Sequence, residues 1–303
     1  MRRRKEIALC LAVLLITLAA GCDSRGASSA GATRAATANA RLADAQPASR
    51  TPQTTTPQQP AARNSMRVIH VFVALCDNVN QGIVPVPARL GNGEDPAHNL
   101  YWGAAFGVKT FFSKSRDWKL VANIPNPQPF ILERVVFRHQ RDAAFLVADA
   151  YRGSEIKRAT LDFLEAASGS AGDTLNLKDD MSAPLNLHLA GSAHLVAYVG
   201  HDGLMDFSLP HHPQRKDDER RDAIILACAS KNYFAPALRQ TGATPLLWTT
   251  NLMAPEAYVL EKAVDGWLKR ESGQQIRTRA AHVYHQYQRC GIKGAMNLFA
   301  TGY

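Results

Sequence analysis

The sequence predicts an α/β protein, a three-layer α/β/α sandwich around a mostly parallel sheet. Two observations predict this class. Short apolar runs of strand length recur along the chain between Gly, Pro and charged residues, which is typical of buried parallel strands. Segments with helical periodicity lie between these runs, and alternating strands and helices indicate a sheet covered on both faces. The chain has 303 residues, and we expect residues 65–303 to form one domain of this class.

The elements follow from apolar patterning, caps and breakers. We expect the first half to contain, in order, a strand at 68–75, a long loop rich in Gly and Pro, a buried helix at 99–112, a strand at 143–150, a helix capped by Ser154 and closed by Gly169, and an irregular segment at 172–193. Around residues 118–121 the pattern is poor and predicts no element. We expect the second half to contain a strand at 195–200, a charged loop at 211–222, a strand at 223–227, a helix at 232–240, a strand at 246–249, a helix beginning at Pro255 and a last helix at 274–290.

The N-terminus resembles that of bacterial lipoproteins. Basic residues at 2–5 precede an apolar stretch at 7–20, which is shorter than the roughly 20 residues of a spanning helix. The stretch ends in Leu-Ala-Ala-Gly-Cys at 18–22, which is similar to a lipobox. The resemblance implies that residues 1–21 are a signal peptide and that Cys22 carries the lipid. The alternatives are an ordinary secretory signal and a failed membrane helix.

Several acyl chains on one residue would hold the protein at a membrane surface through Cys22. The protein is then expected to face the periplasm or the cell exterior. Asp23 resembles a signal for inner-membrane retention, a rule that varies between lineages, so the sequence leaves inner or outer membrane open. Residues 22–64 are rich in Ala, Thr, Ser, Pro and Gln and have no aromatic residue, which predicts a disordered tether.

The charge pattern gives little support for a nucleic-acid partner. The formal net charge is +9, but the four basic residues at 2–5 leave with the signal peptide. The remaining positive charge is dispersed and forms no stripe of Arg and aromatic residues, so we expect no nucleic-acid binding. The sequence does not determine the oligomeric state.

Two apolar runs are each followed by a residue that can take part in nucleophilic catalysis. Residues 195–200 lead to His201, and residues 223–227 lead to Cys228. Neighbouring parallel strands would place this base and this thiol at the same carboxyl edge of the sheet, where such sheets bind ligands. After signal removal and lipidation the other cysteines are Cys76 and Cys290, and a bridge between them would leave Cys228 as a free thiol. The alternative is that all three thiols are buried and inert.

The two runs resemble the caspase–legumain–gingipain clan of cysteine peptidases. The resemblance lies in the order and context of residues 199–203 (Val-Gly-His-Asp-Gly) and 225–230 (Ile-Leu-Ala-Cys-Ala-Ser). It implies a caspase-like fold, Cys228 as the nucleophile, His201 as the acid and base, and an oxyanion hole formed by the backbone amides of Gly203 and Cys228. Two features depart from the clan: Asp202 separates His201 from Gly203, and His201 and Cys228 are 27 positions apart, against about 50 in caspases.

The expected substrate is a peptide or protein. In the clan, the segment at 246–255 builds part of the substrate cleft, and acidic residues would accept basic side chains. The substrate-binding candidates are Asp77, Asp95, Trp248, Asn251 and Glu256. The competing function is a non-catalytic lipoprotein of the same fold that binds a protein partner or a cell-wall component, with Cys228 as a core residue and residues 201–203 as a turn.

Other chemistries fit less well. A papain-like enzyme would have the cysteine before the histidine, and a cysteine phosphatase would have an Arg-containing phosphate loop after Cys228. We expect no cofactor and no metal site, because the histidines lack the paired spacing of zinc ligands. These histidines are His188, His194, His201, His211 and His212.

Overall fold

The computed structural model describes residues 66–170, 172–177 and 185–303. The predicted signal peptide, Cys22 and the predicted tether lie outside the described residues. In the described part, an eight-stranded sheet has the order β10-β9-β8-β7-β1-β4-β3-β2. Five central strands are parallel: β1 (Arg67–Ala74), β4 (Ala144–Tyr151), β7 (Leu195–Val199), β8 (Asp222–Leu226) and β9 (Thr244–Thr249). Three antiparallel strands flank them: β2 (Trp118–Gln128), β3 (Ile131–His139) and β10 (Phe299–Ala300).

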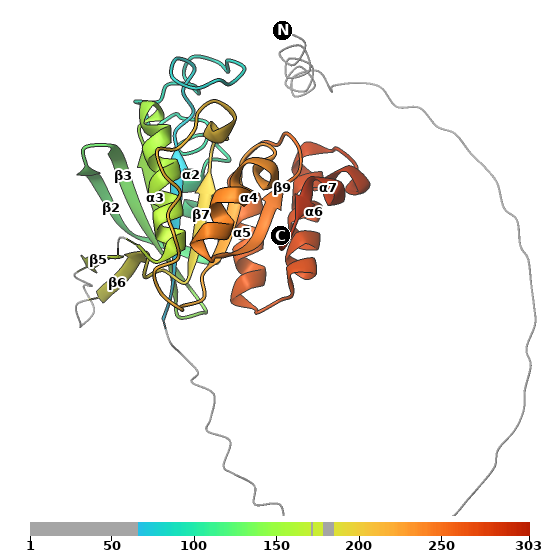
Figure 1. The fold of residues 1–303 in the computed structure, drawn as a ribbon. Coiled ribbons are helices and arrows are strands. Elements are labelled where there is room, and N and C mark those ends of the chain that lie inside the picture. Colours follow the sequence, from blue (N-terminus) through green and yellow to red (C-terminus); the bar gives the residue numbers. More distant parts are fainter. Residues whose placement is uncertain (1–65, 171, 178–184) are drawn as a thin grey trace, which may run out of the picture. The chain divides into compact units, whose positions relative to one another are not determined.

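Helices cover both faces of this sheet (Figure 1). One apolar core lies between the sheet and the first layer, which consists of α3 (Ile156–Ser168) and α4 (Ser230–Thr241). A second core lies between the sheet and the other layer, which consists of α2 (Val108–Ser113), α5 (Ala257–Leu268), α6 (Gly273–Gln288) and α7 (Ile292–Leu298). The predicted three-layer α/β/α sandwich with a mostly parallel sheet is therefore confirmed.

The central strand β1 shows why its sequence reads as one continuous apolar run. Ile69, Val71 and Val73 pack into the core with α5 and α6, while Val68 and Phe72 face α3 and α4. Because both faces are covered, side chains that point in opposite directions are all removed from water. Burying each of these side chains stabilises the fold by roughly 1.5–3 kcal/mol.

Two hairpins were not predicted. The edge strand β2 is largely exposed, so it carries little apolar signal, and it tolerates Pro125 and Pro127 because an edge strand has free N–H positions. Its partner β3 contains the buried Arg134. This charged residue interrupts the apolar run by which a buried strand is recognised. The segment expected to be irregular contains a small hairpin of β5 (Gly172–Leu177) and β6 (Leu185–Ala190). Residues 178–184 between them are not described.

The predicted helix at 99–112 is wrong for most of its length. Turns and bends occupy residues 100–107, and α2 begins only at Val108. A Cβ atom on Gly103 would lie 2.1 Å from the Ala97 carbonyl oxygen, so the chain is folded tightly upon itself here. The side chain of Asn99 accepts the Cys76 N–H at 2.9 Å and donates to the Cys76 carbonyl at 2.8 Å. These bonds fix the loop to the end of β1.

The other helices lie close to their expected positions. Helix α5 begins at Ala257 rather than at Pro255, with Glu256 as its N-cap residue. Helix α6 begins with a capping box of Ser272 and Gln275, a pair that satisfies free N–H groups of the first turn. Helix α7 and strand β10 were not predicted. Within the described residues, no helix combines the length and apolarity that crossing a membrane requires.

Candidate active site at the carboxyl edge of the sheet

The sheet brings His201 and Cys228 to one edge. Strands β7 and β8 are parallel neighbours, and Val199 pairs with Leu226. Each candidate residue follows its strand partner by two positions, so the two residues leave adjacent strands at the same level. Gly200 makes the turn possible, because its φ is +152° and a Cβ atom there would lie 2.9 Å from the Ala74 carbonyl oxygen. The predicted juxtaposition of the two strand ends is present.

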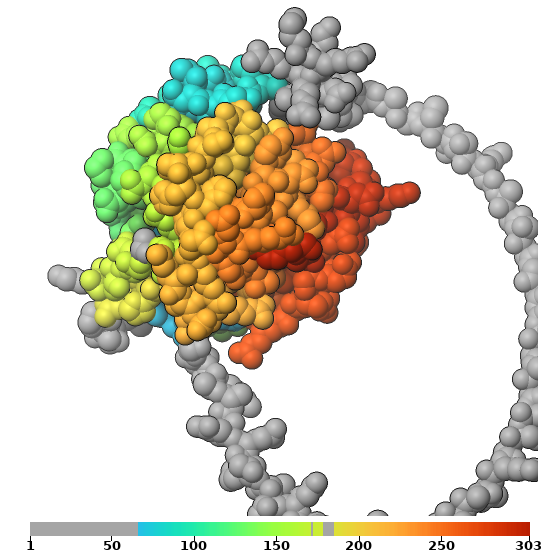
Figure 2. All heavy atoms as spheres, in the orientation of Figure 1, coloured from blue at the N-terminus to red at the C-terminus, as the bar shows by residue number. Residues whose placement is uncertain are grey.

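Asp206 holds the ring of His201. His201 Nε2 lies 2.6 Å from Asp206 Oδ2, and a carboxylate can only accept, so Nε2 carries the proton. In the neutral ring Nδ1 is then the basic nitrogen. The same Asp206 oxygen accepts the Gly82 N–H at 3.0 Å, which joins the loop after β1 to the loop after β7. Figure 2 shows these two segments, cyan and yellow-orange, side by side at one end of the molecule.

Sequence reasoning missed Asp206. Its only sequence signal is an acidic residue in the turn that follows His201. Spacing alone does not show that the chain reverses there. Asp206 closes the short 3-10 turn at 203–205, with its N–H donating to the Gly203 carbonyl at 2.9 Å. That turn brings the Asp206 carboxylate back to Nε2 of the histidine ring.

Cys228 lies directly before the first turn of α4. Ala229 has a left-handed φ of +49°, and α4 begins at Ser230, so the chain bends sharply at the thiol. The Cys228 sulfur lies 3.5 Å from the Met253 carbonyl oxygen and 3.4 Å from the Met253 nitrogen. As a thiolate it accepts the Met253 N–H, and the adjacent helix N-terminus also favours the negative charge. The residue is half-buried.

Two tyrosines lie near this thiol. Burial raises the pKa of Tyr101, and the charges of Cys76 and Cys228 raise it further. Burial also raises the pKa of Tyr284, to about 12, with smaller contributions that include Cys228. The Tyr284 hydroxyl accepts the Ala254 N–H at 3.1 Å. Both phenols therefore stay protonated at neutral pH and act as neutral polar groups beside the thiol.

The other two described cysteines do not form the bridge considered from the sequence. Cys76 is a free, fully buried thiol and Cys290 is a free, exposed one. Burial raises the pKa of Cys76 to about 12, so its reactive thiolate form is suppressed at neutral pH.

Asp202, which separates His201 from Gly203, is a buried acid. Its Oδ1 accepts the Leu204 N–H at 3.1 Å, whereas its Oδ2 has no hydrogen-bond partner in the described part of the chain. Burial raises the pKa of Asp202 to about 7, and the nearby charge of Asp206 raises it too. The Asp202 side chain therefore caps the turn at 203–205, and it is fully shielded from solvent.

Two predicted site residues are wrong. The Gly203 N–H donates to the His201 carbonyl at 3.1 Å and Gly203 is buried, so this amide is committed to the turn and cannot form an oxyanion hole in this conformation. Trp248 is fully buried in the core on the α3–α4 side of the sheet. Its side chain cannot touch a substrate.

Asn251 and Glu256 lie on the segment between β9 and α5, in which Met253 contacts the Cys228 sulfur. The Asn251 carbonyl accepts the Ala229 N–H at 2.9 Å, which fixes the bend at Cys228, and its side chain is exposed. Glu256 accepts a bond from Gln288 Nε2 at 2.9 Å, and burial raises its pKa.

Asp77 and Asp95 serve the long loop after β1. Asp77 is buried and accepts the backbone N–H groups of Val79 and Asn80 at 2.8 and 3.0 Å. The Asp95 carboxylate bonds His98 Nδ1 at 2.7 Å and the Ala97 N–H at 3.0 Å. Both carboxylates are engaged in local turns, so neither is arranged to receive a basic side chain.

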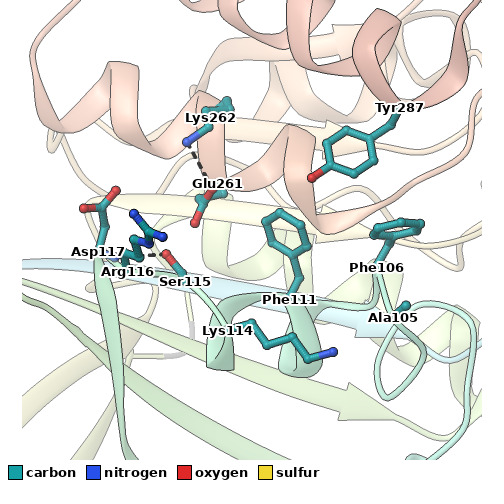
Figure 3. Close-up of a pocket in the computed structure, with 10 residues that line it drawn as sticks. All are labelled: Ala105, Phe106, Phe111, Lys114, Ser115, Arg116, Asp117, Glu261, Lys262 and Tyr287. Carbon is teal, nitrogen blue, oxygen red and sulfur yellow. Dashed lines mark hydrogen bonds and ion pairs between the residues drawn. The ribbon is translucent and has the colours of Figure 1, made fainter.

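The hollow drawn in Figure 3 is a separate feature, on the helical layer formed by α2, α5 and α6. Within the described residues, no group of three or more His, Cys, Asp or Glu side chains could hold a metal ion. Comparison with known proteins identifies no matching family model, curated protein or solved structure, so the geometry of the carboxyl edge carries the functional argument.

Proposed function

We propose that this chain is a membrane-anchored, extracytoplasmic cysteine hydrolase that cleaves peptides with Cys228 and His201, as its resemblance to the caspase–legumain–gingipain clan suggests. The observation that carries the proposal is the register of β7 and β8, which places the two residues at equal levels on adjacent strands. The hydrogen bond that His201 donates to Asp206 supports it, because an orienting carboxylate is a common third member of such sites.

The reaction would proceed by acyl transfer. The Cys228 thiolate attacks the carbonyl carbon of the scissile amide, and a C–S bond forms as the carbonyl electrons move to oxygen. Protonated His201 then gives its proton to the leaving amine, and the C–N bond breaks to leave a thioester. Neutral His201 next takes a proton from water, whose oxygen attacks the thioester carbonyl carbon. The C–S bond then breaks, which releases the acid and regenerates the Cys228 thiolate beside protonated His201. Asp206 holds the ring throughout, and the Cys228 amide, which lies two residues before α4, is the proposed oxyanion donor.

Timed alkylation of the full chain tests the thiol. With iodoacetamide at pH 7, we expect Cys228 to react about tenfold faster than the exposed Cys290, and Cys76 to be slowest, because only the thiolate reacts. His201→Ala should slow Cys228 alkylation by about tenfold, and Asp206→Asn should slow it by a smaller factor. Mass spectrometry of the tryptic peptides gives the three rates separately. His188→Ala, an exposed histidine on β6, is the matched control and should change nothing.

A mixture of synthetic peptides tests hydrolysis directly. New amine termini should form with the full chain and disappear with Cys228→Ala. Alkylation of Cys228 at the rate of Cys290, unaffected by His201→Ala, would remove the basis of the proposal. Cleavage that survives Cys228→Ala would show a different nucleophile.

The second candidate is a non-catalytic lipoprotein that binds a protein partner or cell-wall component. The observation in its favour is the Gly203 N–H, which is committed to the His201 carbonyl rather than available to an oxyanion. Under this alternative the peptide mixture stays intact and His201→Ala leaves the Cys228 rate unchanged. The two experiments above therefore separate the candidates.

The proposed anchor has its own test. Cys22→Ala should abolish incorporation of radioactive fatty acid and leave a precursor with residues 1–21 attached, because only a thiol at that position can form the thioether. Cys10→Ala is the matched control, since Cys10 lies within the signal segment and should leave labelling intact. Continued labelling of Cys22→Ala would rule out lipidation at this residue.

A further inference from the structure

An open hollow of about 490 Å³ lies on the helical layer, between the end of α2 and helices α5 and α6 (Figure 3). This volume falls within the range of small-molecule sites. The hollow is separate from the proposed thiol site, and nothing in the proposed hydrolase assigns it a role. Its two ends differ in chemistry, which restricts the ligand it can take.

One end of the hollow is aromatic. Phe106 and Tyr287 meet edge to face at 5.2 Å, and Phe111 lies 6.5 Å from Tyr287 between ring centroids. Tyr287 also stacks on Tyr258 at 4.1 Å with an interplanar angle of 4°, so a further aromatic ring packs against this wall. Phe106 and Tyr287 are each 39% exposed, so both rings are partly open to water.

The other end is charged with both signs. Figure 3 shows Glu261, Lys262, Arg116 and Asp117 at the end opposite Phe106 and Tyr287. The Glu261 side chain is only 8% exposed, and its Oε2 bonds Lys262 Nζ at 3.1 Å. Lys262 offsets the cost of burying this carboxylate, and a carboxylate with one cationic partner can still accept a further donor. The hollow can therefore offer a carboxylate to a cation and a guanidinium to an anion.

We propose that this hollow binds an α-amino acid with an aromatic side chain, as the zwitterion. The ammonium group would bond the Glu261 carboxylate, the carboxylate would pair with the Arg116 guanidinium, and the ring would pack against Phe106 and Tyr287. A purely anionic ligand would meet Glu261, and a purely cationic one would meet Arg116 and Lys262. A zwitterion with a ring satisfies both charges and covers the aromatic wall.

Calorimetric titration of the full chain with L-phenylalanine tests the ligand class. A ligand of this size in an open site should bind with Kd on the order of 0.1–1 mM. We expect 3-phenylpropionate, phenethylamine and L-alanine, which lack the ammonium, the carboxylate and the ring respectively, to bind at least about tenfold more weakly, since each loses one of the three contacts. No heat of binding from L-phenylalanine up to 10 Kd of that range would overturn the proposal. Equal affinity for phenethylamine or 3-phenylpropionate would overturn the zwitterion.

Variants locate the binding in this hollow. Glu261→Gln and Phe106→Ala should each weaken L-phenylalanine binding by about tenfold. Arg116→Ala, at an exposed residue, should do the same without affecting the fold, and it decides the question if Glu261→Gln does not fold. Tyr233→Ala removes a similarly exposed aromatic ring from α4 and should leave the affinity unchanged. Unchanged affinity in both Arg116→Ala and Phe106→Ala would place any binding elsewhere and overturn the assignment.

Discussion

Asp149→Ala is expected to lower the free energy of unfolding by about 3–5 kcal/mol, because it leaves a buried cation without its partner. Asp149 is fully buried on β4 and receives two bonds from Arg134 on β3, at 2.6 and 2.8 Å. It also accepts from His70 Nε2 on β1 at 3.0 Å. The other ring nitrogen of His70 accepts the Ala190 N–H at 3.1 Å, so the network joins three strands of the sheet to the end of β6.

The same network gives stability a pH dependence. Burial alone would raise the pKa of Asp149, but the hydrogen bonds from Arg134 and His70 and the charge of Arg134 lower it below its usual value. A carboxyl whose pKa is depressed by folding contributes stability above its unfolded pKa of about 3.9. That contribution decreases as the pH falls below about 4, because the unfolded state takes up its proton first, and it is gone once the pH lies below the lowered pKa of the folded state.

Urea denaturation at pH 7 and pH 3 measures both effects. Asp173→Ala is the matched control, because Asp173 also faces Arg134, at 3.6 Å, but its side chain is 54% exposed. We expect this exposed pair to contribute less than about 1 kcal/mol. A loss below about 1 kcal/mol for Asp149→Ala would contradict a buried ion pair at this place.

Asp202→Asn is expected to raise the free energy of unfolding at pH 8, by up to about 4 kcal/mol. The pKa of Asp202 is raised to about 7, by burial first and then by the charge of Asp206, against about 3.9 in the unfolded chain. Between these two values the unfolded state releases its proton while the folded state retains it. Stability therefore falls as the pH rises from about 4 to about 7 and then levels off. Asparagine can accept the Leu204 N–H as aspartate does, but it carries no charge.

Denaturation of wild type and Asp202→Asn between pH 4 and pH 8 checks this sign. The two curves should coincide near pH 4 and diverge toward pH 8, with the variant the more stable. Asp218→Asn, at a fully exposed side chain, serves as control and should run parallel to wild type. A variant that is less stable than wild type at pH 8 would mean that the charged form of Asp202 has a stabilising partner.

The sequence predicted the central sheet because its strands are covered on both faces. Strands β1, β4, β7, β8 and β9 need continuous apolar runs, and such runs are visible without the structure. The edge strands β2 and β3 leave no comparable signal. Arg134 is compatible with a buried strand only because Asp149 lies opposite it in the register of β3 and β4, and a sequence pattern does not display a partner 15 residues away.

The candidate site likewise has features that the sequence determines and features that depend on the tertiary structure. The sequence by itself determined that His201 and Cys228 follow two apolar strands, since strand ends are local properties of the chain. Only the tertiary structure decided that these strands are adjacent and in register, that Asp206 turns back onto the histidine, and that the Gly203 amide is already bonded to His201. Trp248 was misassigned for the same physical reason: which face of β9 it occupies depends on the core packed against that strand, and that core is assembled from residues distant in sequence.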